Sequence, residues 1–238
     1  MQEQFLRTEM LLGEAAMEKL WRSHVAVFGL GGVGSWCAEA LARAGVGELT
    51  LVDHDEVGVT NLNRQVEALW STQGEAKARA MAARIRDISP ACAVHPVAGQ
   101  YSAQTRETFF AVDYDYIVDA IDLVSCKLDL IETALGRGVP IVSSLGTGNK
   151  LDPAQFRIDD LSKTEGCPLA RVIRRELRRR GIKHHRVLFS PEPPQTPVQM
   201  EAPPPGRHSV PASAPWVPPV AGLMLAGDVV LTLTGIPH

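Results

Sequence analysis

A short apolar run that ends in a glycine-rich turn is the feature that most restricts how this chain can fold. Residues 24–28 lead directly into Gly29-Leu30-Gly31-Gly32-Val33-Gly34, and a segment of helical period follows. A strand that turns tightly into a helix leaves free backbone N–H groups at the helix N-terminus, where the helix dipole adds positive charge. The turn therefore predicts a site for nucleotide phosphates inside an α/β fold.

The rest of the chain repeats this alternation of short β-branched runs and longer helical segments. It predicts a doubly wound, mainly parallel, Rossmann-like α/β sheet with helices on both faces and a C-terminal extension. We expect strands at 25–29, 49–53, 93–97, 116–119 and 140–144, and a later pair at 155–159 and 186–190. We expect helices near 9–21, 33–44, 76–88, 103–111, 126–137, 168–180 and 221–233.

We interpret the 238 residues as a single domain, 1–238, with two unusual segments near its end. A basic helix is expected within 168–186. The stretch 191–219 holds 11 of the 17 prolines, so we expect a long extended loop, mobile in part. The apolar stretch 217–233 is interrupted by proline, glycine and Asp228, which argues against a membrane span.

The four cysteines include no Cys-x-x-Cys pair and suggest no disulfide framework. Residues 1–12 contain Arg7 and Glu9 and lack the apolar core of a signal peptide. We therefore expect a cytoplasmic protein with reduced thiols, and we assign no catalytic cysteine.

The glycines and one carboxylate explain how a nucleotide would be held. Gly29 permits the turn, Gly31 and Gly32 let the backbone approach the nucleotide, and Gly34 lets the helix pack near the strand. Asp53 ends the second apolar run, 19 residues after Gly34, a spacing typical of an acid that accepts hydrogen bonds from ribose hydroxyls.

Four further polar residues favour ATP over NAD, which the turn alone does not distinguish. Asn61, Arg64 and Lys77 supply polar and cationic groups where adenylation builds negative charge on the α-phosphate and the departing pyrophosphate. Asp122 follows the fourth expected strand, in the crevice where such sheets bind ligands, and a carboxylate there suits Mg²⁺. Taken singly, each charge could equally be solvated, and Asp122 could cap a helix.

The combined motif resembles that of the ubiquitin-activating-enzyme-like adenylyltransferases. It consists of Gly29-x-Gly31-Gly32-x-Gly34, Leu51-Val52-Asp53-x-Asp55, Asn61-Leu62-Asn63-Arg64-Gln65, Lys77 and Asp119-x-x-Asp122. Within this family the chain most resembles the dehydratases of threonylcarbamoyladenosine in tRNA. The narrower resemblance rests on Arg7-Thr8-Glu9 with Gly13, Gly31-Gly32-Val33-Gly34-Ser35-Trp36, Asp119-Ala120-Ile121-Asp122, Asp152-Pro153, residues 160–164, Cys167-Pro168-Leu169-Ala170 and residues 217–223.

The resemblance implies a role for each matching residue. The four turn glycines and Gln65 would line the nucleotide, and Asp53 would hold the ribose. Asn61, Arg64 and Lys77 would contact the triphosphate, and Asp122 would act through Mg²⁺. Arg7 would reach the γ-phosphate of a neighbouring subunit, which implies a homodimer. The implied catalytic residues are Arg7, Arg64, Lys77 and Asp122.

The implied activity is an ATP-dependent cyclisation of the modified adenosine. ATP would transfer AMP to its carboxylate, and an internal nucleophile would then close a ring and expel AMP. Gln4 stands where the family has an arginine, which removes that arginine's role here. The resemblance also allows adenylation of a ubiquitin-like sulfur-carrier protein, although the paired zinc cysteines usual in those enzymes are absent, and a sulfur-relay partner is possible. An NAD-dependent oxidoreductase or NAD-sensing module remains a third alternative.

The basic segment supports an RNA substrate independently of the resemblance. Residues 1–160 hold 14 Lys+Arg against 22 Asp+Glu, whereas residues 161–238 hold 10 against 5. Side chains at helical spacing form one cationic face that suits RNA phosphates. The residues expected to bind tRNA are Arg171, Arg174, Arg175, Arg178 and Arg179. The segment has no aromatic residue for base stacking, so base recognition is expected elsewhere; an ordinary solvated helix is the alternative.

Overall fold

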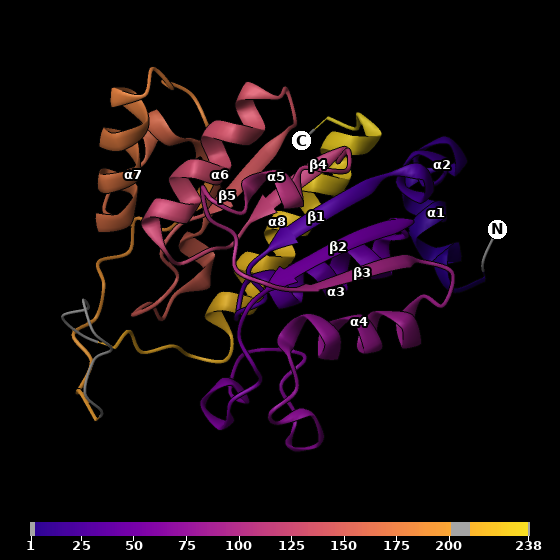
Figure 1. Ribbon diagram of the computed structural model, residues 1–238, viewed down its shortest axis with the longest axis horizontal. Coiled ribbons are helices and arrows are strands. Elements are labelled where there is room, and N and C mark those ends of the chain that lie inside the picture. Colours follow the sequence, from indigo (N-terminus) through magenta and orange to yellow (C-terminus); the bar gives the residue numbers. More distant parts are fainter. Residues whose placement is uncertain (1–2, 201–209, 238) are drawn as a thin grey trace.

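The computed structural model describes residues 3–200 and 210–237. Its strands form a seven-stranded sheet in the order β3-β2-β1-β4-β5-β7-β6, parallel except for β6 (Figure 1). The strands are β1 His24–Phe28, β2 Glu48–Asp53, β3 Ala93–Ala98, β4 Tyr116–Asp119, β5 Ile141–Ser144, β6 Arg157–Asp160 and β7 Arg186–Phe189. The predicted α/β class is confirmed, including the late pair of strands.

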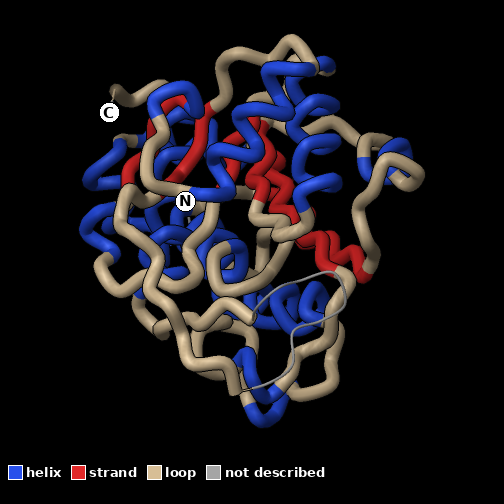
Figure 2. The backbone as a smooth tube through the Cα atoms, turned by 90° about the vertical axis from the view of Figure 1, so that its left-hand side faces the viewer, coloured by secondary structure: helices blue, strands red, loops and turns tan. Residues whose placement is uncertain are grey.

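Helices cover both faces of this sheet (Figures 1 and 2). One apolar cluster joins α3, α4 and α8 to one face, and a second joins α5, α6 and α7 to the other. The helices are α1 Leu6–Leu12, α2 Glu14–Arg22, α3 Gly34–Ala44, α4 Lys77–Ile88, α5 Arg106–Phe109, α6 Val124–Gly136, α7 Pro168–Arg179 and α8 Val217–Thr234.

The register of the central strands brings the predicted site together. Phe28, the last residue of β1, pairs with Val52 on one side and with Asp119 on the other. The strand order reverses between β1 and β4, and ligands of doubly wound sheets bind in the crevice outside such a point. The glycine turn after β1 opens into this crevice.

The single N-terminal helix expected at 9–21 is wrong, because Gly13 divides it. Gly13 has φ 85°, a left-handed conformation that ends α1 before α2 begins. Helix α2 then adjoins the sheet through the hydrogen bond from Gly47 N to Leu20 O, 3.0 Å. Both helices therefore lie at the end of the sheet opposite to the glycine turn.

The basic helix expected within 168–186 occupies the first part of that range, close to the bounds 168–180 expected for it. Helix α7 ends at Arg179, and Gly181 follows with φ 81°. The chain then enters β7 at Arg186, whose guanidinium pairs with the buried carboxylate of Asp228 on α8. Arg186 thus belongs to the packing of α8 rather than to a cationic face.

The last helix begins earlier than expected, so the extended segment ends at residue 216 rather than 219. Pro218 and Pro219 occupy the first turn of α8, where no intrahelical N–H bond is needed. At Gly222 an added Cβ would lie 2.3 Å from Val33 O, which shows how closely α8 packs on α3. Helix α8 has the length and apolar composition of a membrane span, and 61% of it is buried inside the protein.

The described parts of the proline-rich segment are anchored to the body. Asn149 has a left-handed conformation, with φ 59°. Its backbone O accepts a hydrogen bond from Gln195 N at 2.8 Å, and its Oδ1 accepts one from Ala212 N at 2.7 Å. Asn63 Nδ2 donates to Ser213 O at 3.0 Å. The segment thus passes beside the loop that carries Arg64. Residues 201–209 of the stretch that was expected to be mobile in part lie outside the described residues.

Candidate active site

Three of the four turn glycines pack closely against neighbouring atoms, whereas the fourth has open space beside it. Gly29 has φ 89°, and an added Cβ would lie 2.6 Å from Ala120 O; at Gly34 it would lie 1.8 Å from Gly29 O. At Gly32 an added Cβ would lie 2.9 Å from Pro218 Cβ. At Gly31 the nearest atom would be Gln65 Nε2, at 3.9 Å. Gly31 is therefore the position where a ligand can reach the backbone most directly.

Asp53 ties the end of β2 to the glycine turn. Its Oδ2 accepts from Leu30 N at 2.6 Å and its Oδ1 accepts from Asp55 N at 2.8 Å. The side chain is buried, and each oxygen keeps a second lone pair that can accept a hydroxyl proton. The predicted ribose contact is compatible with this geometry.

Arg64 and Asp122 lie near each other at the mouth of the turn. Arg64 donates from Nη1 to Thr60 O at 2.9 Å and to Asn63 Oδ1 at 2.7 Å. Burial lowers the pKa of Arg64, and the Asp122 carboxylate raises it. Asp122 is exposed and has no hydrogen bond or ion pair within the described residues. A cation and an uncommitted carboxylate therefore flank the crevice.

Asn61 and Lys77 are engaged with their own surroundings. Asn61 Oδ1 accepts from Gly58 N at 3.0 Å, which caps the short turn at Val59–Asn61. Lys77, the first residue of α4 and 5% exposed, donates from Nζ to Asp55 Oδ2 at 3.0 Å. Because an ammonium has three donors, Lys77 can donate to a phosphate with the N–H groups that Asp55 does not take.

The carboxylate that ends β4 is Asp119, and Asp122 lies three residues further on. Asp119 accepts from Ile121 N at 3.0 Å and pairs with Lys127 Nζ at 2.6 Å, and both charged side chains are fully buried. This ion pair shapes the loop that presents Asp122. Sequence reasoning missed Lys127, because an isolated lysine on a helix is usually solvated.

The fit of the site to Mg²⁺ rests on Asp122. Magnesium in nucleotide sites commonly takes one or two protein carboxylates and completes its shell with phosphate oxygens and water. In the described part of the chain, Asp53, His54 and Asp55 also have ligand atoms within 4.8 Å of one another. We assign no ion there, since Asp53 is bonded to the backbone and Asp55 to Lys77.

Arg7 is not brought to the site of its own chain. It is exposed on α1, at the far end of the sheet from the glycine turn (Figure 1). Gln65 and Glu67, by contrast, are buried beside the turn, and each has side-chain oxygen atoms without a hydrogen-bond partner in the described residues. Glu67 was missed, because a glutamate in a loop gives no sequence signal of burial.

The cationic face of α7 is smaller than predicted. Arg174 is half-buried and donates to Thr164 O at 2.6 Å, so it holds the preceding loop. Arg175 and Arg179 pair with Glu176 at 2.9 and 3.1 Å. Arg171 and Arg178 are exposed and have no ion pair with any described residue. The structure leaves these two as the most available cations of the predicted set.

His185, in the strand-entry segment after the basic helix, is buried. Its Nε2 lies 2.7 Å from Ser143 Oγ. Burial, aided by the Lys127 charge, lowers its pKa to about 3, so the imidazole is neutral. All four cysteines are buried, as expected for packing residues; burial raises the pKa of the Cys92 thiol to about 11.

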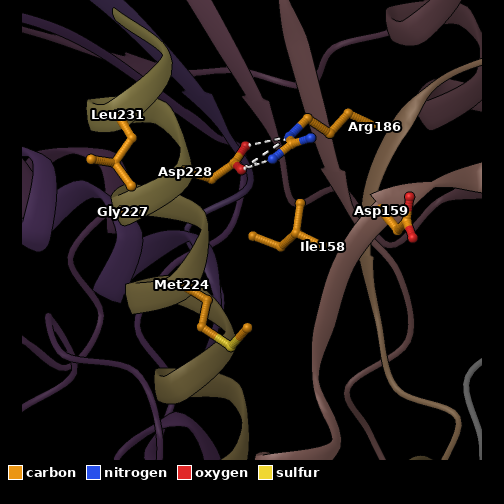
Figure 3. A pocket seen from close by; sticks show the side chains of 7 residues that line it. All are labelled: Ile158, Asp159, Arg186, Met224, Gly227, Asp228 and Leu231. Atoms are coloured by element: carbon orange, nitrogen blue, oxygen red, sulfur yellow. Dashed lines mark hydrogen bonds and ion pairs between the residues drawn. The ribbon is translucent and has the colours of Figure 1, made fainter. Parts of the chain in front are cut away.

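A cleft of about 500 Å³ lies away from these residues, between α8 and the β6–β7 pair (Figure 3). The Arg186–Asp228 ion pair spans it, and none of the predicted ATP-site residues lines it.

The loop that precedes α4 exposes Trp70, an aromatic side chain with 74% of its surface accessible. Sequence reasoning did not single out Trp70.

A phosphate-binding turn at the reversal point of a doubly wound sheet, with Arg64 and Asp122 at its mouth, defines a nucleotide-binding α/β protein. The chain belongs to the ThiF family, whose model matches residues 5–237. The tRNA threonylcarbamoyladenosine dehydratase of Bacillus subtilis is 44% identical over 98% of this chain and 95% of its own length.

The solved structures agree with the sequence relatives. The Escherichia coli enzyme TcdA in complex with ATP has a TM-score of 0.86 and 35% identity, covering 99% of this chain and 97% of its own. Its complex with AMP has a TM-score of 0.88 and 36% identity, covering 98% and 95%. The adenylyltransferase and sulfurtransferase MOCS3 of Mus musculus is 37% identical, over 56% of this chain and 29% of its own length.

Proposed function

We infer that this chain is an ATP-dependent enzyme that removes water from threonylcarbamoyladenosine in tRNA. The observation that carries this inference is the near-full-length similarity to a dehydratase of that substrate, joined to a site with an open glycine turn. The adenylyltransferase and sulfurtransferase MOCS3 matches 56% of this chain, so it gives weaker support to the alternative substrate, a sulfur-carrier protein. The neighbours bind AMP and ATP, which favours adenylation over NAD chemistry.

The proposed reaction has two steps, adenylation of the substrate and ring closure. The substrate carboxylate attacks the α-phosphorus, and the bond to the β-phosphate oxygen breaks, so pyrophosphate leaves. A nucleophile of the same side chain then attacks the activated carbonyl carbon, loses its proton and expels AMP. The net change is the loss of one water, and no nucleophile from the protein is required.

The residues of this chain would position the triphosphate and balance its charge. The N–H groups after Gly29 and the ammonium of Lys77 face the phosphates, and Arg64 offsets charge that develops as pyrophosphate leaves. Asp53 accepts from the ribose. We propose Mg²⁺ at Asp122, where the ion would screen phosphate charge.

We further propose that the enzyme is a homodimer in the cytoplasm. Helix α1, which carries Arg7, lies at the end of the sheet opposite to the glycine turn (Figure 1), so Arg7 would act on the triphosphate from a partner subunit. Four free cysteines suit a reducing compartment. We propose tRNA contact at α7 and, for base stacking, at the exposed Trp70; a sulfur-relay partner remains a proposal from the resemblance alone.

The decisive experiment is incubation of the chain with ATP, MgCl2 and tRNA that carries threonylcarbamoyladenosine. Mass spectrometry of the digested nucleosides should show that nucleoside lose the mass of one water, with AMP and pyrophosphate released in equal amounts. If ATP–pyrophosphate exchange occurs with a carrier protein and never with tRNA, the inference is overturned. Tight binding of NAD without affinity for ATP would remove both adenylation functions.

A further inference from the structure

Glu67 is a buried acid beneath the glycine turn that the proposed reaction does not use. Its side chain is 1% exposed, and neither carboxylate oxygen has a hydrogen-bond partner in the described residues. An isolated buried carboxylate is costly, and such groups usually avoid the cost by taking up a proton.

The groups that could pair with Glu67 are already engaged. On α3, Ser35 Oγ donates to Gly31 O at 2.7 Å and accepts from Val66 N at 3.3 Å. On α4, the Lys77 ammonium is held by Asp55, 3.0 Å away.

Two more charges act on the carboxyl, Arg84 of α4 and Asp53 at the end of β2. Arg84 is already paired with Glu39 at 2.5 Å. Burial raises the pKa of the Glu67 carboxyl to about 7, and the Asp53 charge also raises it. Its own backbone N–H, the Lys77 charge and the nearby Ser35 hydroxyl lower it. The carboxyl therefore lies among groups that act on it in both directions, and its protonated and ionised forms are close in free energy near neutral pH.

We propose that Glu67 is a positioning residue that couples binding of the nucleotide triphosphate to the uptake of a proton beneath the turn. The coupling passes through two contacts. Ser35 joins the floor of the turn at Gly31 to the region of Glu67, and Lys77 is the cation shared between Glu67 and the phosphates. The inference rests on the proposed ATP site.

The direction of the coupling follows from charge. Bound phosphates add negative charge above the turn, and they draw the Lys77 ammonium away from the side chains around Asp55. Both effects disfavour the ionised form of Glu67, so the nucleotide binds more tightly to the protonated enzyme. If binding moves the acid equilibrium by about one pH unit, affinity falls about tenfold as pH rises from below 6 to above 8.

Calorimetry measures this uptake directly. A non-hydrolysable ATP analogue with MgCl2 is titrated at pH 7 in two buffers of different ionisation enthalpy, with wild-type protein, Glu67→Gln and Glu75→Gln. Glu75 is an exposed glutamate of the same loop and serves as the matched control. We expect the wild type and Glu75→Gln to take up the same fraction of a proton, and Glu67→Gln to take up measurably less. Subtraction removes protonation of the nucleotide itself.

The outcomes separate this inference from the proposed function. Equal proton uptake in the wild type and Glu67→Gln overturns the coupling while leaving the ATP site intact. Absence of binding to the wild type contradicts the ATP site itself. If Glu67→Gln does not fold, Glu67→Leu replaces it as the variant, because leucine is an apolar side chain in an apolar setting. A second test needs no variant: if the dissociation constant of the ATP analogue from the wild type is constant from pH 6 to 8.5, the coupling is overturned.

Discussion

Lys127 Nζ lies 2.6 Å from Asp119 Oδ2, and both side chains are completely buried behind the site. Lys127 also donates to Ser144 O at 3.0 Å, so it links β4 to β5. Because neither charge has access to water, loss of either partner alone would strongly lower the free energy of unfolding.

Breaking that pair should destabilise the protein strongly. Lys127→Met leaves the Asp119 carboxylate buried without its partner, and we expect a loss of about 3–5 kcal/mol in the free energy of unfolding. Urea denaturation checks this value. The double variant Lys127→Met with Asp119→Asn removes both charges, so it should recover much of the loss; a double variant as unstable as the single one would contradict the ion-pair account.

Removal of the exposed carboxylate should affect activity and leave the fold unchanged. Asp122→Asn is expected to lower the turnover number by about 100-fold or more, because the proposed metal ligand is lost. Its thermal unfolding should match that of the wild type. Asp113→Asn, an exposed aspartate near the start of β4, is the control and should retain full activity. An active Asp122→Asn enzyme would rule out the magnesium role.

Subunit mixing should reveal whether Arg7 acts across a dimer. Arg7→Ala and Asp122→Ala proteins should each be inactive, whereas a heterodimer of the two contains one site with both residues intact. Because random mixing makes about half of the dimers hybrid, activity should recover to about a quarter of the wild-type value. Confirmed heterodimers that remain inactive would show that Arg7 does not act in trans.

The arginines of α7 should separate into RNA-binding and structural residues. Neutralising Arg171 and Arg178 is expected to weaken tRNA binding and to reduce the slope of log affinity against log salt by about one to two, while ATP affinity is unchanged. Arg174→Gln should instead lower stability by about 1–3 kcal/mol, because buried carbonyl groups of the preceding loop lose their donor. Filter binding at several salt concentrations and urea denaturation distinguish the two effects.

His185 should make the protein less stable in acid. Its pKa is lowered to about 3 in the folded protein, whereas an unfolded histidine has a pKa near 6.5, so the unfolded state binds the extra proton. Its contribution is complete above pH 6.5 and falls by about 1.4 kcal/mol per pH unit below it. Urea denaturation at pH 7.5 and pH 5 should show a smaller difference for His185→Gln than for the wild type. An identical difference would contradict a neutral buried imidazole.

The local parts of this structure were predictable from sequence. The glycine turn and Asp53 were correctly placed at the ends of neighbouring strands, because hydrophobic alternation and glycine geometry act over a few residues. The break at Gly13 had a signal that was not used: a glycine inside a helical pattern often marks an end. Pro218 and Pro219 could likewise have indicated the first turn of α8.

The features that were missed depend on contacts between distant segments. Lys127, Glu67 and His185 are ordinary polar residues in sequence, and only the packing of other elements buries them. Arg174 was assigned to the RNA face by helical spacing, yet its partner Thr164 lies in a loop before the helix. Periodicity identifies the exposed face of a helix but cannot reveal which long side chain turns back toward a carbonyl group.

The position of α8 has a consequence for how the protein is made. Its apolar residues Val217, Ala221, Leu225 and Val229 are fully buried, and its first turn closes against Gly32. A nascent chain that still has these residues inside the ribosomal tunnel therefore exposes the apolar side of α3, and its glycine turn lacks the contact with α8. Competence to hold a nucleotide therefore arrives only after this helix has emerged and docked on α3.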